Sequence, residues 1–475
     1  MRLQTPPEEG EVVSLAHDGR GVVRASGKTV FVPGALPGER VVFCRLRKRR
    51  SYDEAMLVEV LVRAPERVEP ACPHFGTCGG CALQHLDATA QVEFKRAHLA
   101  EELARIGKVE PAEWLPPLTA SPWAYRRRAR LGARYVPKKG KALVGFRERA
   151  SPYIAEIERC HVLADPVGPL VGALGTLIGG LSIRERVPQI EVAIADETVA
   201  LVFRVLDAPA AADVASLTAF GVAHGIDIWL QPGGYETVAA LTPPARPLAY
   251  SLPDFDVTLQ FEPCDFVQVN APLNRLMVAR AVGLLDPQPS DSVLDLYCGL
   301  GNFSLPLARR AGSVVGVEGD VGLVARARAN AERNGLGNVG FHVANLASDL
   351  RGSPWLERGY DLVLLDPPRA GAAEVLPAVV AARPRRSLAD RCLGPRRSRV
   401  ASAAPRGARR GRPGRGTQHA ADRRRARELR ARARPAPRGA GRRMADWRVE
   451  PGACGVAARR PAPRAAARTP GGGAV

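Results

Sequence analysis

Short runs of alternating apolar and polar residues fill the first part of the chain. Five runs lie between residues 10 and 63 and are separated by turn-forming pairs such as Asp18-Gly19; they read EVVSLAH, GVVRAS, TVFVPG, ERVVFCRLR and AMLVEVLV. A period of two is typical of half-buried β-strands, and five short strands in succession indicate a small barrel. We therefore predict an OB-like β-barrel over residues 1–65.

The pattern is mixed between residues 66 and 270. A helix is expected over residues 90–106, and strands such as IEVAIA and TVALVFRVL are followed by turns such as Gln231-Pro232-Gly233-Gly234. Mixed strands and helices without strict alternation indicate an α+β domain. This central domain begins with the proline-bearing linker at residues 65–70 and also contains a cluster of cysteines.

Helical and strand patterns alternate strictly from about residue 271. Helices are expected at residues 272–285, 303–310 and 320–334, and the strands between and after them read SVLDLY, SVVGVE, VGFHVA and DLVLLD. Such alternation builds a doubly wound parallel sheet, so residues 271–386 are predicted to form a Rossmann-like α/β domain. Because no strand pattern follows DLVLLD and its helix, we expect the sheet to end there with an uncovered edge.

Residues 387–475 lack any such pattern. Arg, Ala, Gly and Pro make up 66 of these 89 residues, and Ile, Phe, Tyr, Asn and Lys do not occur. A segment of this composition cannot bury enough apolar surface to fold, so we predict a disordered tail. The codons of these four residues begin with two G or C bases. We therefore favour an out-of-frame segment of a GC-rich gene, which truncates the α/β domain, over a genuine basic tail.

The formal net charge of +20 comes almost entirely from this tail, which contains 24 arginines. The first 386 residues are nearly neutral, with a net charge of +1. Two local basic clusters are left, at residues 45–50 and at residues 123–149, and the second is interleaved with aromatic residues. Such surfaces bind phosphates and stack bases, but they are also common as solvated faces. The clusters alone do not decide between these interpretations.

Several classes of protein are excluded by the apolar pattern. No run approaches the roughly 18 apolar residues of a membrane helix. The first residues, MRLQTPPEEGEVV, lack the apolar stretch of a secretory signal. We expect a cytoplasmic protein without membrane contacts, in which the nine cysteines are ligands, nucleophiles or core residues rather than disulfides.

A glycine turn follows the first strand of the α/β domain. SVLDLY runs directly into Cys298-Gly299-Leu300-Gly301-Asn302. Glycines at this point allow the backbone to approach a ligand before a helix begins. A dinucleotide fingerprint needs a third glycine where Ser304 stands, so S-adenosylmethionine (SAM) fits better. Glu318 ends the next strand, where its carboxylate can accept both ribose hydroxyls of that cofactor.

Three more polar positions extend this site. Asn345 follows the third strand, near the expected adenine, and Gln268 lies in the run F-E-P-C-D-F-V-Q-V-N just before the domain. Asp366-Pro367-Pro368 ends the fourth strand. Together with the turn and Glu318, these residues indicate a methyltransferase. Arg369 follows where amino-methyltransferases acting on bases place an aromatic residue, which argues against that class.

Four cysteines form a second candidate site. Cys72, Cys78 and Cys81 lie within ten residues, and Cys160 follows much later in Glu158-Arg159-Cys160-His161. Four thiolates suffice for a zinc ion or an iron–sulfur cluster. Zinc sites usually combine two close pairs, so three clustered ligands and a distant fourth favour the cluster. Four buried free cysteines are the alternative.

The chain resembles the iron–sulfur RNA uracil-5-methyltransferases, and among them those that modify 23S ribosomal RNA. The resemblance covers residues 10–386 and rests on a TRAM-like barrel, C-x5-C-G-G-C with a distant cysteine, D-L-Y-C-G-L-G-N-F-S-L-P and L-D-P-P-R-A-G. It implies methyl transfer from SAM to carbon 5 of a uridine in 23S ribosomal RNA, and we expect a monomer. By this resemblance a 4Fe-4S cluster is held by Cys72, Cys78, Cys81 and Cys160, and SAM is surrounded by Gln268, Tyr297, Asn302, Glu318, Asn345 and Asp366.

The sequence departs from this family where catalysis should occur. The family adds a cysteine thiolate to carbon 6 of uracil, and a Glu later removes the proton at carbon 5. Its nucleophile lies in Ser-Cys-x-Pro and its base in His-x-x-Glu, both after the segment that corresponds to residue 386. Here Cys392 lies in a different context, and His419 has no Glu three residues later. We therefore predict no catalytic residue in the chain as written; a non-catalytic RNA-binding remnant is the alternative function.

Overall fold

The computed structural model describes residues 6–389 except 349, 351 and 370. Cys392, His419 and the predicted tail from residue 390 onward lie outside the described residues. No helix in the described part is long and apolar enough to cross a membrane.

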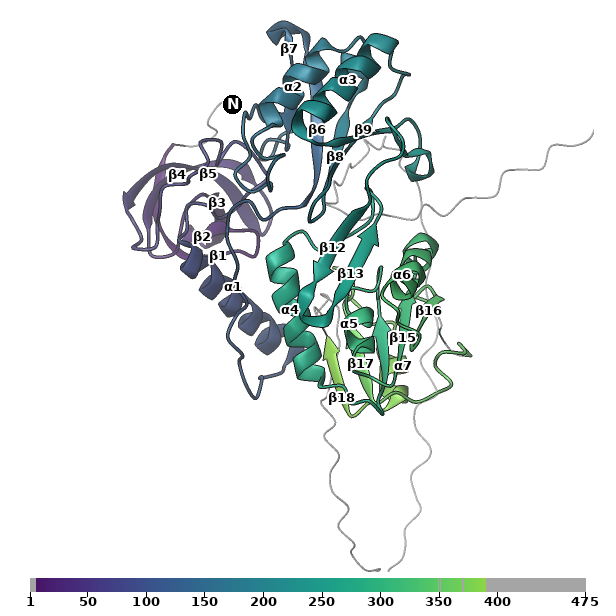
Figure 1. The fold of residues 1–475 in the computed structure, drawn as a ribbon. Helices are drawn as coiled ribbons and strands as arrows, with labels where there is room; N and C mark the ends of the chain where they lie inside the picture. Colours follow the sequence, from purple (N-terminus) through teal and green to yellow (C-terminus); the bar gives the residue numbers. More distant parts are fainter. Residues whose placement is uncertain (1–5, 349, 351, 370, 390–475) are drawn as a thin grey trace, which may run out of the picture. The chain divides into compact units, whose positions relative to one another are not determined.

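The first five strands close into a barrel, which confirms the prediction for this region (Figure 1). Val23, Val30 and Phe43 are fully buried inside it, because alternate side chains of each strand point inward. The strands pair in the order β1-β2-β3-β5-β4 and span β1 Glu8–Leu15, β2 Arg20–Ala25, β3 Lys28–Pro33, β4 Arg40–Lys48 and β5 Tyr52–Val62.

One member of the basic cluster at residues 45–50 belongs to the barrel itself. Arg45 is only 6% exposed, and its guanidinium forms ion pairs with Glu8 at 2.8 Å and with Asp53 at 2.5 Å. Both interpretations of the cluster, a nucleic-acid surface and a solvated face, are wrong for this residue. A buried arginine must be paired, and here it joins three strands.

The central region contains α1 (Ala88–Glu102), continued by one wider turn at Leu103–Gly107, and then a six-stranded sheet. The helix agrees with the expected residues 90–106. The sheet order is β11-β10-β9-β8-β6-β7, and β9 and β10 are its parallel pair. Its elements are β6 Arg128–Val136, β7 Lys141–Gly145, α2 Val171–Gly180, β8 Gln189–Ile194, β9 Val199–Arg204, α3 Ala211–His224, β10 Asp227–Gln231 and β11 Ala239–Ala240.

A two-stranded sheet of β12 (Leu248–Leu252) and β13 (Val257–Phe261) precedes α4 (Ala271–Leu285) and a five-stranded parallel sheet. The order β16-β15-β14-β17-β18 confirms a doubly wound sheet with helices on both faces (Figure 1). Its elements are β14 Ser292–Leu296, α5 Ser304–Ala308, β15 Ser313–Glu318, α6 Val321–Arg333, β16 Val339–Val343, β17 Leu362–Leu365, α7 Leu376–Ala382 and β18 Arg386–Ala389.

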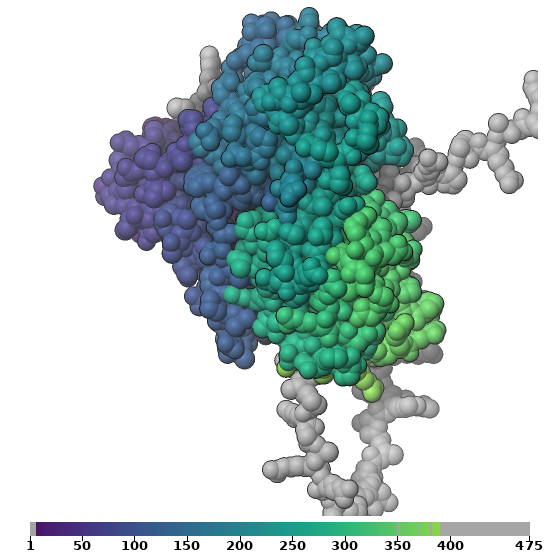
Figure 2. Space-filling model, viewed as in Figure 1, coloured from purple at the N-terminus to yellow at the C-terminus, as the bar shows by residue number. Residues whose placement is uncertain are grey.

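Both faces of the parallel sheet are buried. Val293 of β14 packs in one apolar cluster together with side chains of α4, α5 and α6, whereas its neighbour Leu294 packs in another with Trp355 and Val375. This explains the nearly continuous apolar runs in these strands. With all atoms drawn, side chains fill the spaces between the elements (Figure 2).

The expected uncovered edge after β17 is wrong. Residues 386–389 form β18, which pairs in parallel with β17 from Leu362↔Arg386 to Leu365↔Ala389. The sheet therefore continues three residues into the segment assigned to the tail. The sequence pattern does not predict this strand, because Arg-Ser-Leu-Ala is short and shows no apolar alternation.

Candidate functional site

The glycine turn lies at the carboxyl edge of the parallel sheet, where open α/β sheets bind their ligands. Tyr297, Gly299 and Gly301 all have positive φ, of 66°, 56° and 97°. A glycine adopts this conformation without strain, whereas the tyrosine is half-buried and is held there by its N–H, which donates to the carbonyl of Val317 at 2.9 Å. The turn thus connects the ends of β14 and β15.

Glu318 ties the same two strands together through its side chain. Its carboxylate accepts hydrogen bonds from the N–H groups of Gly299 at 3.1 Å, Gly319 at 2.7 Å and Asp320 at 3.1 Å. Three of roughly four acceptor positions are therefore used by backbone. The structure places the acid beside the turn, as the sequence predicts, and adds a structural role that the sequence did not reveal.

Gln268 and Asp366 meet across 98 positions of sequence. The amide nitrogen of Gln268 donates to a carboxylate oxygen of Asp366 at 3.5 Å, the outer limit of a hydrogen bond. Asp366 follows β17, and its N–H donates to the carbonyl of Leu296 at the end of β14. The run at residues 261–270 is thus brought to the carboxyl edge of the sheet.

Asn302 is embedded in a polar network at the end of the turn. Its amide exchanges two hydrogen bonds with Asn274 of α4, at 2.9 and 3.0 Å, and its oxygen also accepts from the Tyr250 hydroxyl at 3.0 Å. Only one side-chain N–H is left over from these contacts. Asn302 therefore positions the turn, and neither Asn274 nor Tyr250 carries a sequence signal for this function.

Asn345 lies two residues after β16, beside Glu318, whose carbonyl accepts from the N–H of Ala344 at 2.9 Å. Its side-chain oxygen accepts from the N–H of Ala347 at 3.0 Å, so it stabilises the turn that follows the strand. The side chain is exposed. The strand register therefore places Asn345 at the expected edge of the sheet.

Sequence reasoning missed Asp295, which is fully buried in β14. One of its oxygens accepts from the Ser304 hydroxyl at 2.5 Å, whereas the other has no hydrogen-bond partner. Burial raises the pKa of Asp295 to about 7, and the charges of Asp366 and Glu318 act in the same direction. An acid inside an apolar strand is the signal that could have identified it, since buried carboxylates are rare without a partner.

A cavity of about 180 Å³ opens beside Asp366. Its walls come from α4, β17 and β18 together with Phe303 of the glycine turn region, and they are mostly apolar. A pocket with a mostly apolar lining and two charged side chains, those of Arg280 and Asp366, is typical of small-molecule sites.

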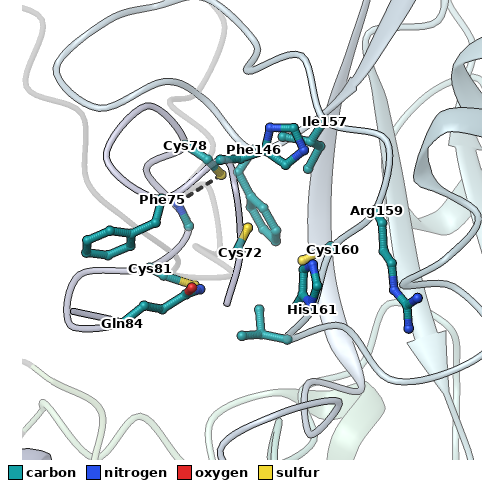
Figure 3. Close-up of a pocket in the computed structure, with 13 residues that line it drawn as sticks. Cys72, Phe75, Cys78, Cys81, Gln84, Phe146, Ile157, Arg159, Cys160 and His161 are labelled. Atoms are coloured by element: carbon teal, nitrogen blue, oxygen red, sulfur yellow. Dashed lines mark hydrogen bonds between the residues drawn. The ribbon is translucent and has the colours of Figure 1, made fainter. Parts of the chain in front are cut away.

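The four predicted metal ligands line one cavity. Figure 3 shows the sulfur atoms of Cys72, Cys78, Cys81 and Cys160 around a common space between the loop at residues 72–84 and the loop at residues 157–162. The N–H of Gly80 donates to the Cys78 sulfur at 3.4 Å. Burial raises the pKa of the Cys78, Cys81 and Cys160 thiols, and the neighbouring cysteines add to these shifts.

Two glycines allow the cysteine loop to pack closely. A side chain at Gly79 would lie 2.9 Å from the carbonyl of Arg147, and one at Gly80 would lie 2.9 Å from the ring of Phe146. The N–H of Gly79 donates to the same carbonyl at 2.8 Å. Glycines are therefore needed at both positions between Cys78 and Cys81, because the loop packs against residues 146 and 147 just after β7.

The predicted metal centre itself is not confirmed by these positions. Within the described ranges, no group of three or more His, Cys, Asp or Glu side chains is arranged to hold a metal ion. The donor chemistry nevertheless fits a thiolate-bound metal, because four thiols share one cavity and backbone N–H groups of Gly80, Val162 and Leu163 donate to two of the sulfurs.

Comparison with known proteins agrees with this geometry. Residues 251–384 match the family model for tRNA (uracil-5-)-methyltransferase. The 23S rRNA (uracil(1939)-C(5))-methyltransferase RlmD of Alkalilimnicola ehrlichii is 53% identical over 392 residues, which cover 82% of this chain and 88% of that protein. The chain belongs to the RNA uracil-5-methyltransferase family.

Other members of this family give the same result. RlmD of Methylococcus capsulatus is 51% identical over 378 residues, with 79% of this chain and 85% of that protein covered. Among solved structures, Pyrococcus abyssi tRNA (uracil-54, C5)-methyltransferase in complex with S-adenosyl-L-homocysteine aligns with a TM-score of 0.61 and 23% identity, over 79% of this chain and 87% of that chain. This similarity shows a shared fold.

Proposed function

We propose that the chain derives from an enzyme that transfers methyl from SAM to carbon 5 of a uridine in 23S ribosomal RNA. The carrying observation is the convergence of Gln268, Glu318 and Asp366 on the glycine turn, in a chain 53% identical to a protein of that name. The decisive test compares two proteins for methylation of 23S ribosomal RNA. One is this chain, and the other is the frame-restored product, in which the gene is read in the shifted frame after residue 386.

We propose roles for the side chains around the turn. When bound, SAM supplies a methyl group from a positively charged sulfonium. Glu318 would accept hydrogen bonds from ribose hydroxyls, Gln268 and Asp366 would position the cofactor and target at the sheet edge, and Tyr297, Asn302 and Asn345 would complete the surroundings. The charges of Glu318 and Asp366 act on Asp295, and together these three carboxylates would offset the positive charge.

A catalytically dead RNA-binding remnant is the second candidate. It is favoured by the absence of the family's nucleophile and base motifs after residue 386 and by the end of the family match at residue 384. Such a remnant would keep SAM and RNA binding without methyl transfer. RNA binding without turnover in the chain as written therefore distinguishes it from the enzyme.

Our proposal for the domain organisation follows the sequence. Residues 1–65 would be a TRAM-like barrel, residues 66–270 an iron–sulfur domain and residues 271–386 the truncated methyltransferase domain, which β18 extends to residue 389. The rest of the segment 387–475 would be an out-of-frame tail. The exposed basic residues of the region 123–149 would contact RNA phosphates. We propose that the protein acts as a cytoplasmic monomer.

Replacing Glu318 by Ala is expected to weaken SAM binding by at least tenfold. A hydrogen bond to a charged acceptor contributes about 1.5–3 kcal/mol, and the variant loses the ribose contact at the remaining acceptor position as well as the link to Gly299. Isothermal titration calorimetry measures the change. The matched control is Glu332→Ala, which removes an exposed carboxylate of α6 and should leave the affinity unchanged. Equal affinities for the native chain and Glu318→Ala would refute the ribose role.

We further propose that Cys72, Cys78, Cys81 and Cys160 hold a 4Fe-4S cluster. Four thiols in one cavity and N–H donors to the sulfurs support this, as does Arg126, whose positive charge lowers the pKa of the Cys81 and Cys160 thiols against the effect of burial. A cluster with four thiolates is an anion, so the half-buried arginine beside it is favourable.

Protein prepared without oxygen is expected to contain iron and acid-labile sulfide in equal amounts. Each Cys→Ser variant at these four positions should lower both, whereas Cys44→Ser in the barrel core should leave the iron content per folded molecule unchanged. Metal analysis and the visible absorption spectrum provide the measurement. A colourless preparation with one zinc per chain would contradict the cluster.

A further inference from the structure

The segment at residues 124–128 is hydrogen-bonded to the loop that carries Cys160. The N–H of Ala124 donates to the carbonyl of His161 at 2.9 Å, and the N–H of Arg126 donates to the carbonyl of Val162 at 2.8 Å. In return, the N–H of Ala164 donates to the carbonyl of Arg126 at 3.0 Å. The segment and the loop therefore form a short parallel ladder.

The cysteine is attached to the other side of this ladder. The Cys160 sulfur accepts hydrogen bonds from the N–H groups of Val162 and Leu163. The residues that contact Arg126 are thus the same residues that hold the sulfur. In addition, the side-chain Nε of Arg126 is buried without a hydrogen-bond partner, and its charge acts on the Cys81 and Cys160 thiols. A change in charge at the sulfur atoms therefore acts directly on this arginine.

The opposite edge of the segment is bonded to the run that carries Gln268. The N–H of Arg127 donates to the carbonyl of Val269 at 2.9 Å, and Arg126 pairs antiparallel with Asn270. The guanidinium of Arg128 donates to the carbonyl of Pro263, near the beginning of the run. Residues 126–128 therefore hold both ends of the segment in which Gln268 lies.

The hydrogen bond of Gln268 to Asp366 is expected to be sensitive to small displacements of this run. Its hydrogen bond to Asp366 already has a length of 3.5 Å, so a shift of a few tenths of an ångström breaks it. Residues 124–128 form a continuous path of hydrogen bonds from the cysteine cavity to the cofactor edge. Mere proximity does not establish coupling, but here one element is bonded to both sites.

We propose that occupancy of the cysteine site controls SAM affinity, because residues 124–128 transmit the position of the Cys160 loop to the run that carries Gln268. In this arrangement Arg128 is a positioning residue for Gln268. The coupling rests on the proposed function, since it requires a metal centre at the cysteines and SAM at the glycine turn. Thermodynamic linkage then requires SAM to tighten metal binding by the same factor.

The test measures SAM binding to the full chain by calorimetry before and after anaerobic removal of iron with a chelator. We expect the affinity to fall about tenfold without iron. Hydrogen exchange of the Arg127 and Ala164 amides should accelerate, whereas the amides of β15 should keep their protection. Loss of protection in β15 as well would indicate general unfolding and would overturn a local coupling.

The variant Arg128→Gln tests the hydrogen-bond path while leaving the cluster in place. The variant should bind SAM more weakly by a similar factor while its iron content stays normal. Arg184→Gln, which changes an exposed arginine outside residues 123–149, should leave SAM affinity and iron content unchanged. Identical SAM affinities with and without iron, in a chain shown to contain iron, overturn the coupling. A chain that binds no iron overturns the cluster proposal instead, and a normal SAM affinity of Arg128→Gln then refutes the positioning role independently.

Discussion

The 475-residue chain is expected to release no tritium above background from 23S ribosomal RNA labelled at carbon 5 of uridine. Carbon 5 of uracil is a weak nucleophile, and transfer requires a thiolate that adds to carbon 6. Near the glycine turn, burial raises the pKa of the Cys298 thiol well above its usual value, so this cysteine does not supply a thiolate. The loss relative to the frame-restored product should be several orders of magnitude.

The frame-restored product is the positive control, since it should regain Ser-Cys-x-Pro and His-x-x-Glu. Both proteins should bind SAM, which separates a missing nucleophile from a misfolded domain. Cys392→Ala in the chain as written is the informative variant, although this residue lies outside the described part of the structure. Tritium release by the chain as written that disappears in Cys392→Ala would make Cys392 the nucleophile and refute this interpretation.

The fold was largely predictable because the apolar pattern matches the elements. In the α/β region, both faces of β14, β15 and β17 are buried, so each strand is a compact and mostly apolar run, and the predicted ends agree within about two residues. The barrel has one buried face and shows the expected alternation. β18 was missed because its pairing depends on β17, and no local pattern in Arg-Ser-Leu-Ala indicates it.

The candidate site was predictable where its polar side chains lie at the ends of strands. Glu318, Asn345 and Asp366 follow consecutive parallel strands, and such ends meet at one edge of the sheet. Contacts between distant segments were not predictable, because they depend on packing. Examples are the Asn302–Asn274 amide pair and the connection of Arg126 to both the Cys160 loop and Asn270.

Asp295→Asn is expected to stabilise the SAM-free protein at pH 8 and to weaken SAM binding. In the unfolded chain the Asp295 carboxyl ionises with its usual pKa of about 3.8, whereas burial in the folded chain raises the pKa to about 7. Folding therefore becomes less favourable as pH rises from about 4 to 7, by an amount on the order of 4 kcal/mol. Asn cannot ionise and avoids this penalty, while its oxygen can still accept from Ser304.

Urea unfolding at several pH values measures this effect. The variant should gain about 2–4 kcal/mol over the native chain at pH 8, and the gain should vanish near pH 4, where the native carboxyl is protonated in both states. Asp361→Asn is a control for which the opposite change in stability is expected, because hydrogen bonds from Ser292 lower the pKa of Asp361. That variant should be less stable than the native chain above pH 4.

SAM binding tests whether the buried charge of Asp295 serves the cofactor. The ligand is a cation, so its affinity for the native chain should increase between pH 6 and 8 as Asp295 ionises, and binding should release protons to the buffer. The affinity of Asp295→Asn should be lower and independent of pH in this range. If the variant gained stability and yet bound SAM as tightly as the native chain at pH 8, the unpartnered carboxylate oxygen would have no function in cofactor binding.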